Sequence, residues 1–153
     1  MTPAFTVSRA ATLDDCRPVR PLVEAHVEYE RSGATVPVDW AERVAPFVAS
    51  GELAIFVAHR GSEAVGYASL TTDMSTWTGD LLGHLDCLFV ADAHRGAGLG
   101  RLLIDAAAEE ARSRGLRELR WQTPEWNVSA IRFYDRLGAS GETKQRFALR
   151  LDQ

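Results

Sequence analysis

The 153-residue sequence lacks most of the features that would indicate a membrane, secreted or nucleic-acid-binding protein. It has two cysteines, too few and too far apart for a disulfide framework, which favours a reducing, cytoplasmic location. No apolar run approaches the ~20 residues needed to cross a bilayer, and the first five residues lack the basic and apolar parts of a signal peptide. The net charge of −4 gives no electrostatic basis for nucleic-acid binding. We therefore expect neither a membrane nor a nucleic acid as a partner.

Internal repeats, linkers and low-complexity tracts are also missing from the sequence. Apolar residues make up 46% and charged residues 25%, the proportions of an ordinary globular protein. A chain of this length can bury a sizeable core. We predict a single domain over residues 1–153.

The most informative stretch is a strand, a glycine-rich turn and a helix. Leu85–Val90 is a short apolar run typical of a buried strand, and Arg95–Gly100 opens onto a helix with one apolar face. Glycines allow close backbone approach to a ligand, and the first amides of a helix attract anions. The glycine spacing is neither that of a dinucleotide-binding loop nor that of a P-loop. It predicts an anion-binding turn, although such glycines can also serve only to pack a helix against a sheet.

Hydrophobic periodicity and turn residues predict the remaining elements. Thr12, followed by Asp14 and Asp15, predicts the start of a short helical turn, after which we expect a helix from about Pro18 to Glu30. Further along the chain we expect a second helix capped by Asp39 and running to Ser50, the long helix ending at Arg114, and a short helix capped by Asn127. Thr71–Gly79 is predicted as a polar loop. The predicted strands are Phe5–Ala10, Leu53–His59, Val65–Leu70, Leu85–Val90, Leu116–Thr123 and Phe147–Leu151.

This order of elements predicts an α/β fold. Its sheet is mixed and mostly antiparallel, with a central parallel β-α-β crossover over Leu85–Thr123 and helices on both faces.

Two motifs, in order and at a typical separation, carry a family resemblance. The first is Arg95-Gly96-Ala97-Gly98-Leu99-Gly100, and the second is Trp126-Asn127-x-x-Ala130-Ile131-x-Phe133-Tyr134-x-x-Leu137-Gly138-Ala139. Over Leu53–Leu149 the sequence resembles the GNAT superfamily of N-acetyltransferases. The resemblance implies the GNAT fold and acetyl-CoA as cofactor.

Three further segments look like the diamine (spermidine/spermine) acetyltransferase branch and its bacterial relatives. They are Trp77–Gly79, Leu85–Val90 and Glu125–Asn127. This narrower resemblance implies a homodimer and a small-molecule amine as the acceptor.

The resemblance also implies which residues bind coenzyme A. Backbone amides of the turn hold the diphosphate, and the preceding strand bulges, splays from its neighbour and pairs with the pantetheine arm. The matching positions are Leu88, Phe89, Val90, Arg95, Gly96, Ala97, Gly98, Leu99, Gly100, Arg101, Asn127, Ser129, Ala130 and Tyr134.

Two residues are candidates for catalysis. Tyr134 matches the general acid of the family. A phenol stays protonated at neutral pH and can give its proton to a departing thiolate, which suits this role. A core tyrosine with a satisfied hydroxyl is the alternative. Asp86 is the single carboxylate in an apolar strand, so it has a partner or faces a cleft. At its position the diamine branch has an acid that attracts the substrate ammonium and accepts its proton.

The neighbours of Asp86 leave several alternatives open. Cys87 stands where the branch usually has a second acid, and it can be a nucleophile or, more commonly for a free cysteine, a small buried apolar residue. His84 can be a proton shuttle or a strand-edge residue. It is a poor metal ligand because no second ligand cluster accompanies it, and we predict no metal.

The acceptor site is the least specified part of the sequence. Tyr29, Glu30 and Glu142 match or lie near positions that line the amine pocket of the diamine branch, together with Asp86. Lys144 and Arg146 can instead bind a carboxylate.

We predict direct acetyl transfer from acetyl-CoA to a primary amine of a small molecule, polyamine-like or amino-acid-like, in a ternary complex. The alternatives are a protein or peptide acetyltransferase acting on lysine or an N-terminal amine, and a non-catalytic acyl-CoA-binding sensor.

Overall fold

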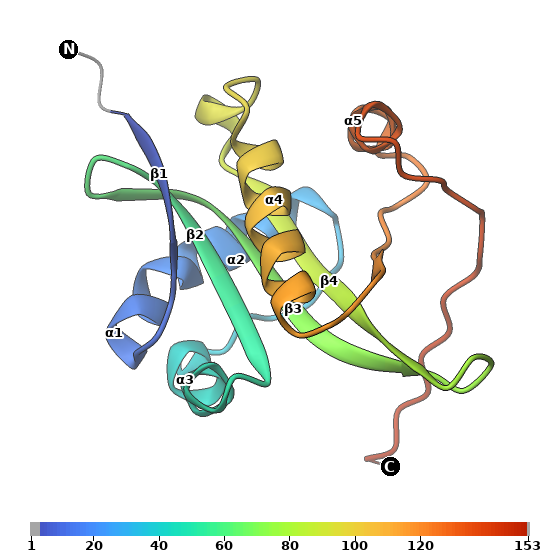
Figure 1. The fold of residues 1–153 in the computed structure, drawn as a ribbon. Helices are drawn as coiled ribbons and strands as arrows, with labels where there is room; N and C mark the ends of the chain where they lie inside the picture. Colours follow the sequence, from blue (N-terminus) through green and yellow to red (C-terminus); the bar gives the residue numbers. More distant parts are fainter. Residues whose placement is uncertain (1–3, 153) are drawn as a thin grey trace. The chain divides into compact units, whose positions relative to one another are not determined.

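The computed structural model describes residues 4–152 (Figure 1). A five-stranded sheet has the order β1-β2-β3-β4-β5. Neighbouring strands are antiparallel from β1 to β4, whereas β5 is parallel to β4. The strands are β1 (Phe5–Arg9), β2 (Leu53–Arg60), β3 (Glu63–Ser75), β4 (Asp80–Val90) and β5 (Leu119–Arg120). This arrangement confirms the mixed, mostly antiparallel sheet with a parallel crossover.

Five α-helices and two short 3₁₀ helices accompany these strands in residues 4–152. They are α1 (Leu13–Cys16), η1 (Arg17–Val19), α2 (Arg20–Tyr29), α3 (Trp40–Ser50), η2 (Asp92–His94), α4 (Leu99–Ser113) and α5 (Val128–Arg136). The chain divides into two compact units, Met1–Trp121 and Gln122–Gln153. The sheet and α1–α4 belong to the first unit, and α5 belongs to the second.

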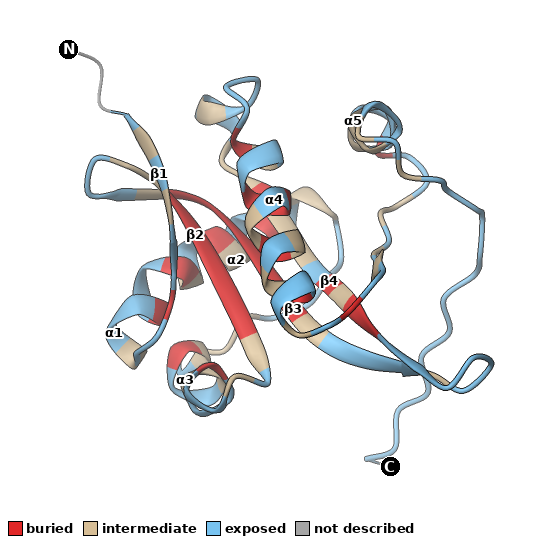
Figure 2. Ribbon diagram, viewed as in Figure 1, coloured by how far each residue is buried: buried red, intermediate tan, exposed pale blue. Residues whose placement is uncertain are grey.

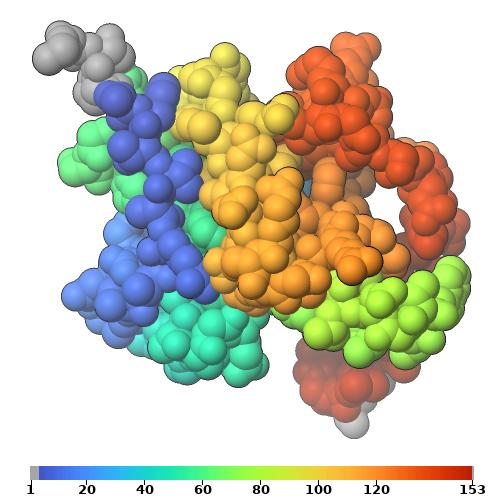
Figure 3. Space-filling model, viewed as in Figure 1, coloured from blue at the N-terminus to red at the C-terminus, as the bar shows by residue number. Residues whose placement is uncertain are grey.

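Helices cover both faces of the sheet in the first unit. On one face, α1–α3 pack against alternate residues of the strands, among them Ile55, Val57, Tyr67 and Phe89. On the other face lies α4, which covers the near side in Figure 3. Its buried stripe, marked red in Figure 2, includes Leu99 and Leu103, with 1% and 0% of their surface exposed. Burying a leucine side chain fully contributes about 1.5–3 kcal/mol, so this stripe fixes α4 on the sheet.

The predicted helix starts are confirmed in part. At α1, the Thr12 side chain accepts a hydrogen bond from the Asp15 amide while the Asp15 carboxylate accepts one from the Thr12 amide, which is a complete capping box. Asp39 is the N-cap residue of α3, as predicted, but its side chain forms no capping hydrogen bond. Its carboxylate instead accepts from Arg43 Nε at 2.9 Å, because one turn of helix brings the two side chains together.

The predicted loop over Thr71–Gly79 is wrong, because β3 continues to Ser75 and pairs with β4 in a long hairpin. Met74 is half exposed and Trp77, in the turn, is 93% exposed. A hairpin that extends beyond its covering helices has water on both faces, so its strands carry polar residues that resemble a loop in sequence.

The strand predicted over Leu116–Thr123 is reduced to β5, which pairs with β4 only at Gly83 and His84. Gly83 allows this close approach, because an added Cβ there would lie 2.6 Å from the Leu119 side chain. The strand predicted over Phe147–Leu151 is wrong, since no strand is present there. Its apolar residues alternate as in a strand, but Phe147, Leu149 and Leu151 are all exposed. An alternation of apolar and polar residues therefore does not form a β-strand where no other strand pairs with it.

None of the helices between residues 4 and 152 combines the length and the apolar character required to span a membrane.

Candidate active site

The anion-binding turn predicted from the sequence lies between the end of β4 and the start of α4. Its first side chain, Arg95, ties the turn to the strand: Nε donates to the Val90 carbonyl at 2.9 Å, and Nη1 lies 3.3 Å from an Asp92 carboxylate oxygen. The Arg95 guanidinium also lies over two aromatic rings, 4.3 Å from the centroid of Tyr29 and 5.4 Å from that of Phe89. Arg95 therefore joins the turn, β4 and α2.

Two glycines of the turn have left-handed backbone and open space beside them. Gly96 and Gly98 have φ angles of 80° and 83°, in the left-handed region that favours glycine. No heavy atom lies within 4 Å of an added Cβ at either position, so the space beside them is open. The Leu102 amide donates to the Gly98 carbonyl at 3.2 Å. The amides of Leu99–Arg101 therefore precede the first helical hydrogen bond and can bind an anion such as a diphosphate.

The strand before the turn carries a β-bulge. Ser69 of β3 is opposite Cys87 and Leu70 is opposite Leu85, so Asp86 is the extra residue of β4. The bulge predicted from the family resemblance is present, two residues before Leu88, and it coincides with the predicted base.

Within the first unit, the end of β4 pairs with a strand on one side only. Leu88, Phe89 and Val90 pair with β3, whereas the pairing of β4 with β5 ends at His84. Within the first unit, this edge is where a pantetheine arm can pair with the strand.

The Asp86 side chain faces an open cavity. It is 62% exposed, and its two oxygens lie 3.4 Å from His84 Nε2 and 3.7 Å from Cys87 Sγ. Asp86 thus has both a partner and a cleft, which removes the cost of burying a lone carboxylate. The cavity, of about 660 Å³, is lined by Phe47, Ser50, Gly51, Glu52, Leu53, Thr71, Thr72, Asp86 and Arg114.

Cys87 lies beside this carboxylate but is held as a thiol. Burial, followed by the negative charge of Asp86, raises the pKa of Cys87 to about 11. The thiolate fraction at pH 7 is then on the order of 10⁻⁴. This low fraction does not support the nucleophile alternative, because the thiolate is the reactive form.

Two residues at the site were not predicted from the sequence. The Tyr67 hydroxyl lies 2.8 Å from His26 Nδ1, and His26 Nε2 lies 3.2 Å from a Glu30 carboxylate oxygen. Burial raises the pKa of Tyr67 far above its usual value. The four-residue spacing of His26 and Glu30 predicts that these two side chains can meet. The contact of His26 with Tyr67 on β3 depends on the tertiary fold and has no local sequence signal.

The residues predicted to line the amine pocket have other partners. Tyr29 packs against Phe89, with ring centroids 6.3 Å apart, and lies beneath Arg95. Glu30 pairs with His26. Glu142, in the second unit, pairs with Lys144 Nζ at 2.9 Å, and both side chains are exposed.

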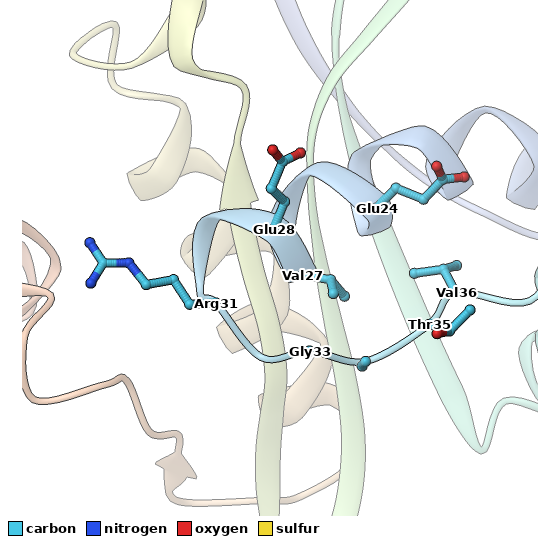
Figure 4. Close-up of a pocket in the computed structure, with 8 residues that line it drawn as sticks. Glu24, Val27, Glu28, Arg31, Gly33, Thr35 and Val36 are labelled. Atoms are coloured by element: carbon cyan, nitrogen blue, oxygen red, sulfur yellow. The ribbon is translucent and has the colours of Figure 1, made fainter.

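A second, smaller hollow of about 440 Å³ lies against α2 and the segment after it (Figure 4). Glu24 and Glu28 project from α2, whereas Arg31 extends beyond the end of the helix. Arg31 has a φ of 56°, which is uncommon for a residue other than glycine. The hollow is lined by Glu24, Val27, Glu28, Arg31, Gly33, Ala34, Thr35 and Val36.

The second unit contains the second sequence motif. Asn127 caps α5, as predicted: its Oδ1 accepts from the Ala130 amide at 3.4 Å and from Ser129 Oγ at 3.3 Å. Its Nδ2 donates to Thr123 Oγ1 at 3.3 Å. Tyr134 lies on α5 beside Phe133, with ring centroids 5.5 Å apart. The roles of Asn127 and Tyr134 toward acetyl-CoA rest on the family resemblance.

Comparisons with known proteins identify the class. The acetyltransferase (GNAT) family model matches residues 19–139, and the chain belongs to this family. The thialysine N-epsilon-acetyltransferases of Caenorhabditis elegans and Bos taurus are each 30% identical to it, over 92% of this chain and 88% of theirs. An aminoglycoside N-acetyltransferase in complex with CoA has the same fold, with a TM-score of 0.81 at 19% identity, covering 99% of this chain and 97% of that one.

The predicted superfamily, enzyme class and cofactor are therefore confirmed. The protein is an acetyl-CoA-dependent N-acetyltransferase.

Proposed function

We propose that the acceptor is the primary amine of a small, cationic molecule, polyamine-like or amino-acid-like. The observation that carries the proposal is Asp86, placed by the bulge at an open cavity and next to the strand end that leads to the anion-binding turn. Glu52 adds a second carboxylate to the same cavity. The cation of its lining, Arg114, is paired with Glu110 at 3.0 Å, so the two carboxylates favour an ammonium group. The thialysine acetyltransferase relatives, similar over 92% of this chain, support an amine borne on an amino acid.

The mechanism assigns each residue of the site one task. Acetyl-CoA supplies a thioester acetyl group. The amides of Leu99–Arg101 and the glycines before them bind its diphosphate, and the open edge of Leu88–Val90 aligns its arm. The Asp86 carboxylate takes a proton from the acceptor ammonium, and the free amine attacks the acetyl carbon. An amide near the bulge polarises the carbonyl, and the carbon–sulfur bond breaks. Tyr134 gives its hydroxyl proton to the leaving sulfur, and the second proton that the nitrogen loses on forming the amide restores the hydroxyl.

The proposal also covers the domain organisation, the location, the oligomeric state and the partners of the protein. Both units form one acetyltransferase domain, which is supported by the family match across their boundary. The protein acts in the cytoplasm, in keeping with its two free thiols. It forms a homodimer, for which the exposed apolar side chains of Phe147, Leu149 and Leu151 offer a surface suited to a second copy. Neither a membrane nor a nucleic acid is a partner, in keeping with the net charge of −4.

The test measures thiol release from acetyl-CoA across polyamines, amino acids including lysine and thialysine, aminoglycosides and a lysine peptide. We expect the fastest release with a polyamine or a diamino acid. Tyr134→Phe should lower kcat by ~10² with little change in acetyl-CoA affinity, and Asp86→Asn should lower kcat most at neutral pH. Acetylation of the peptide alone would indicate a protein substrate. Acetyl-CoA binding without release for any amine would indicate a sensor.

A further inference from the structure

We propose that Arg114 binds a carboxylate of the acceptor, so that the enzyme prefers a diamino acid to the diamine that lacks only this carboxylate. The proposal rests on the proposed function, because it takes Asp86 as the group that receives the reacting ammonium. Arg114 is the C-cap residue of α4, and its side chain lines the same cavity as Asp86. All the residues on which the proposal depends belong to the first unit.

The Arg114 guanidinium is held by contacts with two elements. Its Nε and Nη2 each donate to Glu110 Oε1 at 3.0 Å, one helical turn earlier on α4. Its Nη1 donates to Thr72 Oγ1 of β3 at 3.3 Å. The Arg114 side chain is 20% exposed. Because it is already fixed in place, this guanidinium loses little conformational entropy when it binds a ligand.

The same guanidinium keeps donors for a ligand. An arginine carries five N–H groups, and between residues 4 and 152 the partners of Arg114 are the Glu110 carboxylate and the Thr72 hydroxyl. These contacts use one N–H group on each nitrogen, so one remains on Nη1 and one on Nη2. Two N–H groups on the terminal nitrogens can donate to both oxygens of a carboxylate.

Glu110 offsets the charge of Arg114 only in part, because Glu110 is shared between two arginines. Its Oε1 also lies 3.0 Å from Arg9 Nη2 of β1. Two guanidinium groups therefore face one carboxylate, which leaves one excess positive charge beside the cavity. An excess positive charge favours an anionic group on the ligand.

The other charged residues that line the cavity are two carboxylates, Asp86 and Glu52. Glu52 Oε1 accepts from Ser50 Oγ at 3.1 Å, and Gly51 between them is the C-cap residue of α3. The C-terminal end of a helix favours a cation, which adds to the effect of Glu52. The lining thus offers two places for ammonium groups and, at Arg114, one for a carboxylate. A diamino acid has these three charges, whereas a diamine brings only positive charge toward Arg114.

The register of the sheet indicates how long the acceptor should be. Thr72, which binds Arg114, is opposite Gly83 of β4, and Asp86 follows Gly83 by three residues, of which Asp86 is the extra residue of the bulge. A strand rises about 3.4 Å per residue, so these positions are about 7–10 Å apart along the sheet. A long diamino acid such as lysine spans this separation better than 2,3-diaminopropionate.

The test compares two substrates that differ only in the carboxylate, since 1,5-diaminopentane is lysine without it. Arg114→Gln removes the charge, and Glu110 keeps Arg9 as a partner. Arg114→Lys keeps the charge. The matched control is Arg112→Gln on the same helix, where the side chain is 70% exposed and lies 3.5 Å from Glu109. Thiol release at pH 7.5 and saturating acetyl-CoA gives kcat and KM for each substrate.

We expect the wild type to have a kcat/KM about tenfold or more higher for lysine than for 1,5-diaminopentane, because a hydrogen-bonded charge pair forms with lysine alone. Arg114→Gln should raise the KM for lysine about tenfold or more. It should lower the KM for 1,5-diaminopentane, because it removes a positive charge that repels the diamine. Arg114→Lys should keep part of the preference for lysine, and Arg112→Gln should match wild type with both substrates.

A merely structural role of Arg114 would impair both substrates together, so changes of KM in the same direction would overturn the inference. An Arg112→Gln variant that loses the preference as Arg114→Gln does would overturn it too. If the wild type acetylates 1,5-diaminopentane as well as lysine, the proposed function stands and the role of Arg114 fails.

A wild-type protein that acetylates no amine would defeat the proposed function, and the role of Arg114 would then be judged by binding. Isothermal titration calorimetry with lysine in the presence of CoA should show an affinity for the wild type about tenfold or more above that for Arg114→Gln. Equal affinities, or no binding to the wild type, would end the proposal.

Discussion

The two glycines at the ends of α4 provide a matched test of the anion-binding turn. Gly98 precedes the helix with a φ of 83°, and Gly115 follows it with a φ of 77°. Neither has a heavy atom within 4 Å of an added Cβ, so alanine meets no clash at either site. Left-handed backbone costs an alanine roughly 1–2 kcal/mol. We expect Gly98→Ala and Gly115→Ala to lower the free energy of unfolding by this same amount.

The affinity for acetyl-CoA should differ between Gly98→Ala and Gly115→Ala. A methyl group added at position 98 would project where the diphosphate of acetyl-CoA approaches the amides of Leu99–Arg101, whereas position 115 lies at the other end of the 15-residue helix. Gly98→Ala should weaken acetyl-CoA binding at least tenfold, or about 1.4 kcal/mol, and Gly115→Ala should leave it unchanged.

Urea denaturation and isothermal titration calorimetry measure the two quantities separately. The melting temperature should fall by about 2–4 °C for each kcal/mol in a chain of this size. Equal acetyl-CoA affinities in the two variants would refute the assignment of the turn as the diphosphate site. Unequal losses of stability would refute the reasoning that backbone strain is the only cost.

Two further predictions concern titratable groups. Because burial raises the pKa of Cys87 to about 11, iodoacetamide at pH 7.5 should modify it at least ~10² times more slowly in the folded protein than in urea, as followed by mass spectrometry; equal rates would contradict the raised pKa. Backbone hydrogen bonds from Ala11 and Thr12 lower the pKa of Asp15. A lowered folded-state pKa stabilises the protein above the unfolded value of about 3.9, and this stabilisation is lost as the pH falls through the folded value. Asp15→Asn should therefore destabilise the fold at pH 7 and lose this effect in acid, as measured by urea denaturation at each pH; a difference independent of pH would contradict the prediction.

Local sequence was sufficient wherever a structure is made by neighbouring residues. The capping box at Thr12, the cap at Asn127 and the glycines before α4 were each predictable, because the interacting groups lie within a few residues of one another. At Asp39 the local pattern was less decisive. Asp39 lies at the start of α3, but its carboxylate binds Arg43, four residues later, and does not cap the helix.

The boundaries of the strands were less predictable, because they depend on which other strands lie beside them in the sheet. The β3–β4 hairpin extends through a polar segment, since its end needs only a partner strand and no core. Phe147–Leu151 has the reverse pattern, with strand-like alternation and no strand. The same alternation of side chains gives different structures according to whether another strand pairs with it.

The sequence by itself determined the family and pointed to the glycine-rich turn before α4 and to Asp86 as candidate site residues, because these depend on motifs of adjacent residues. Only the tertiary structure decided that the bulge falls at Asp86 and that His26 and Tyr67, 41 positions apart, share a hydrogen bond. Register and burial arise from how strands pair and helices pack across long separations. A local pattern specifies which side chains are available, and packing decides which of them meet.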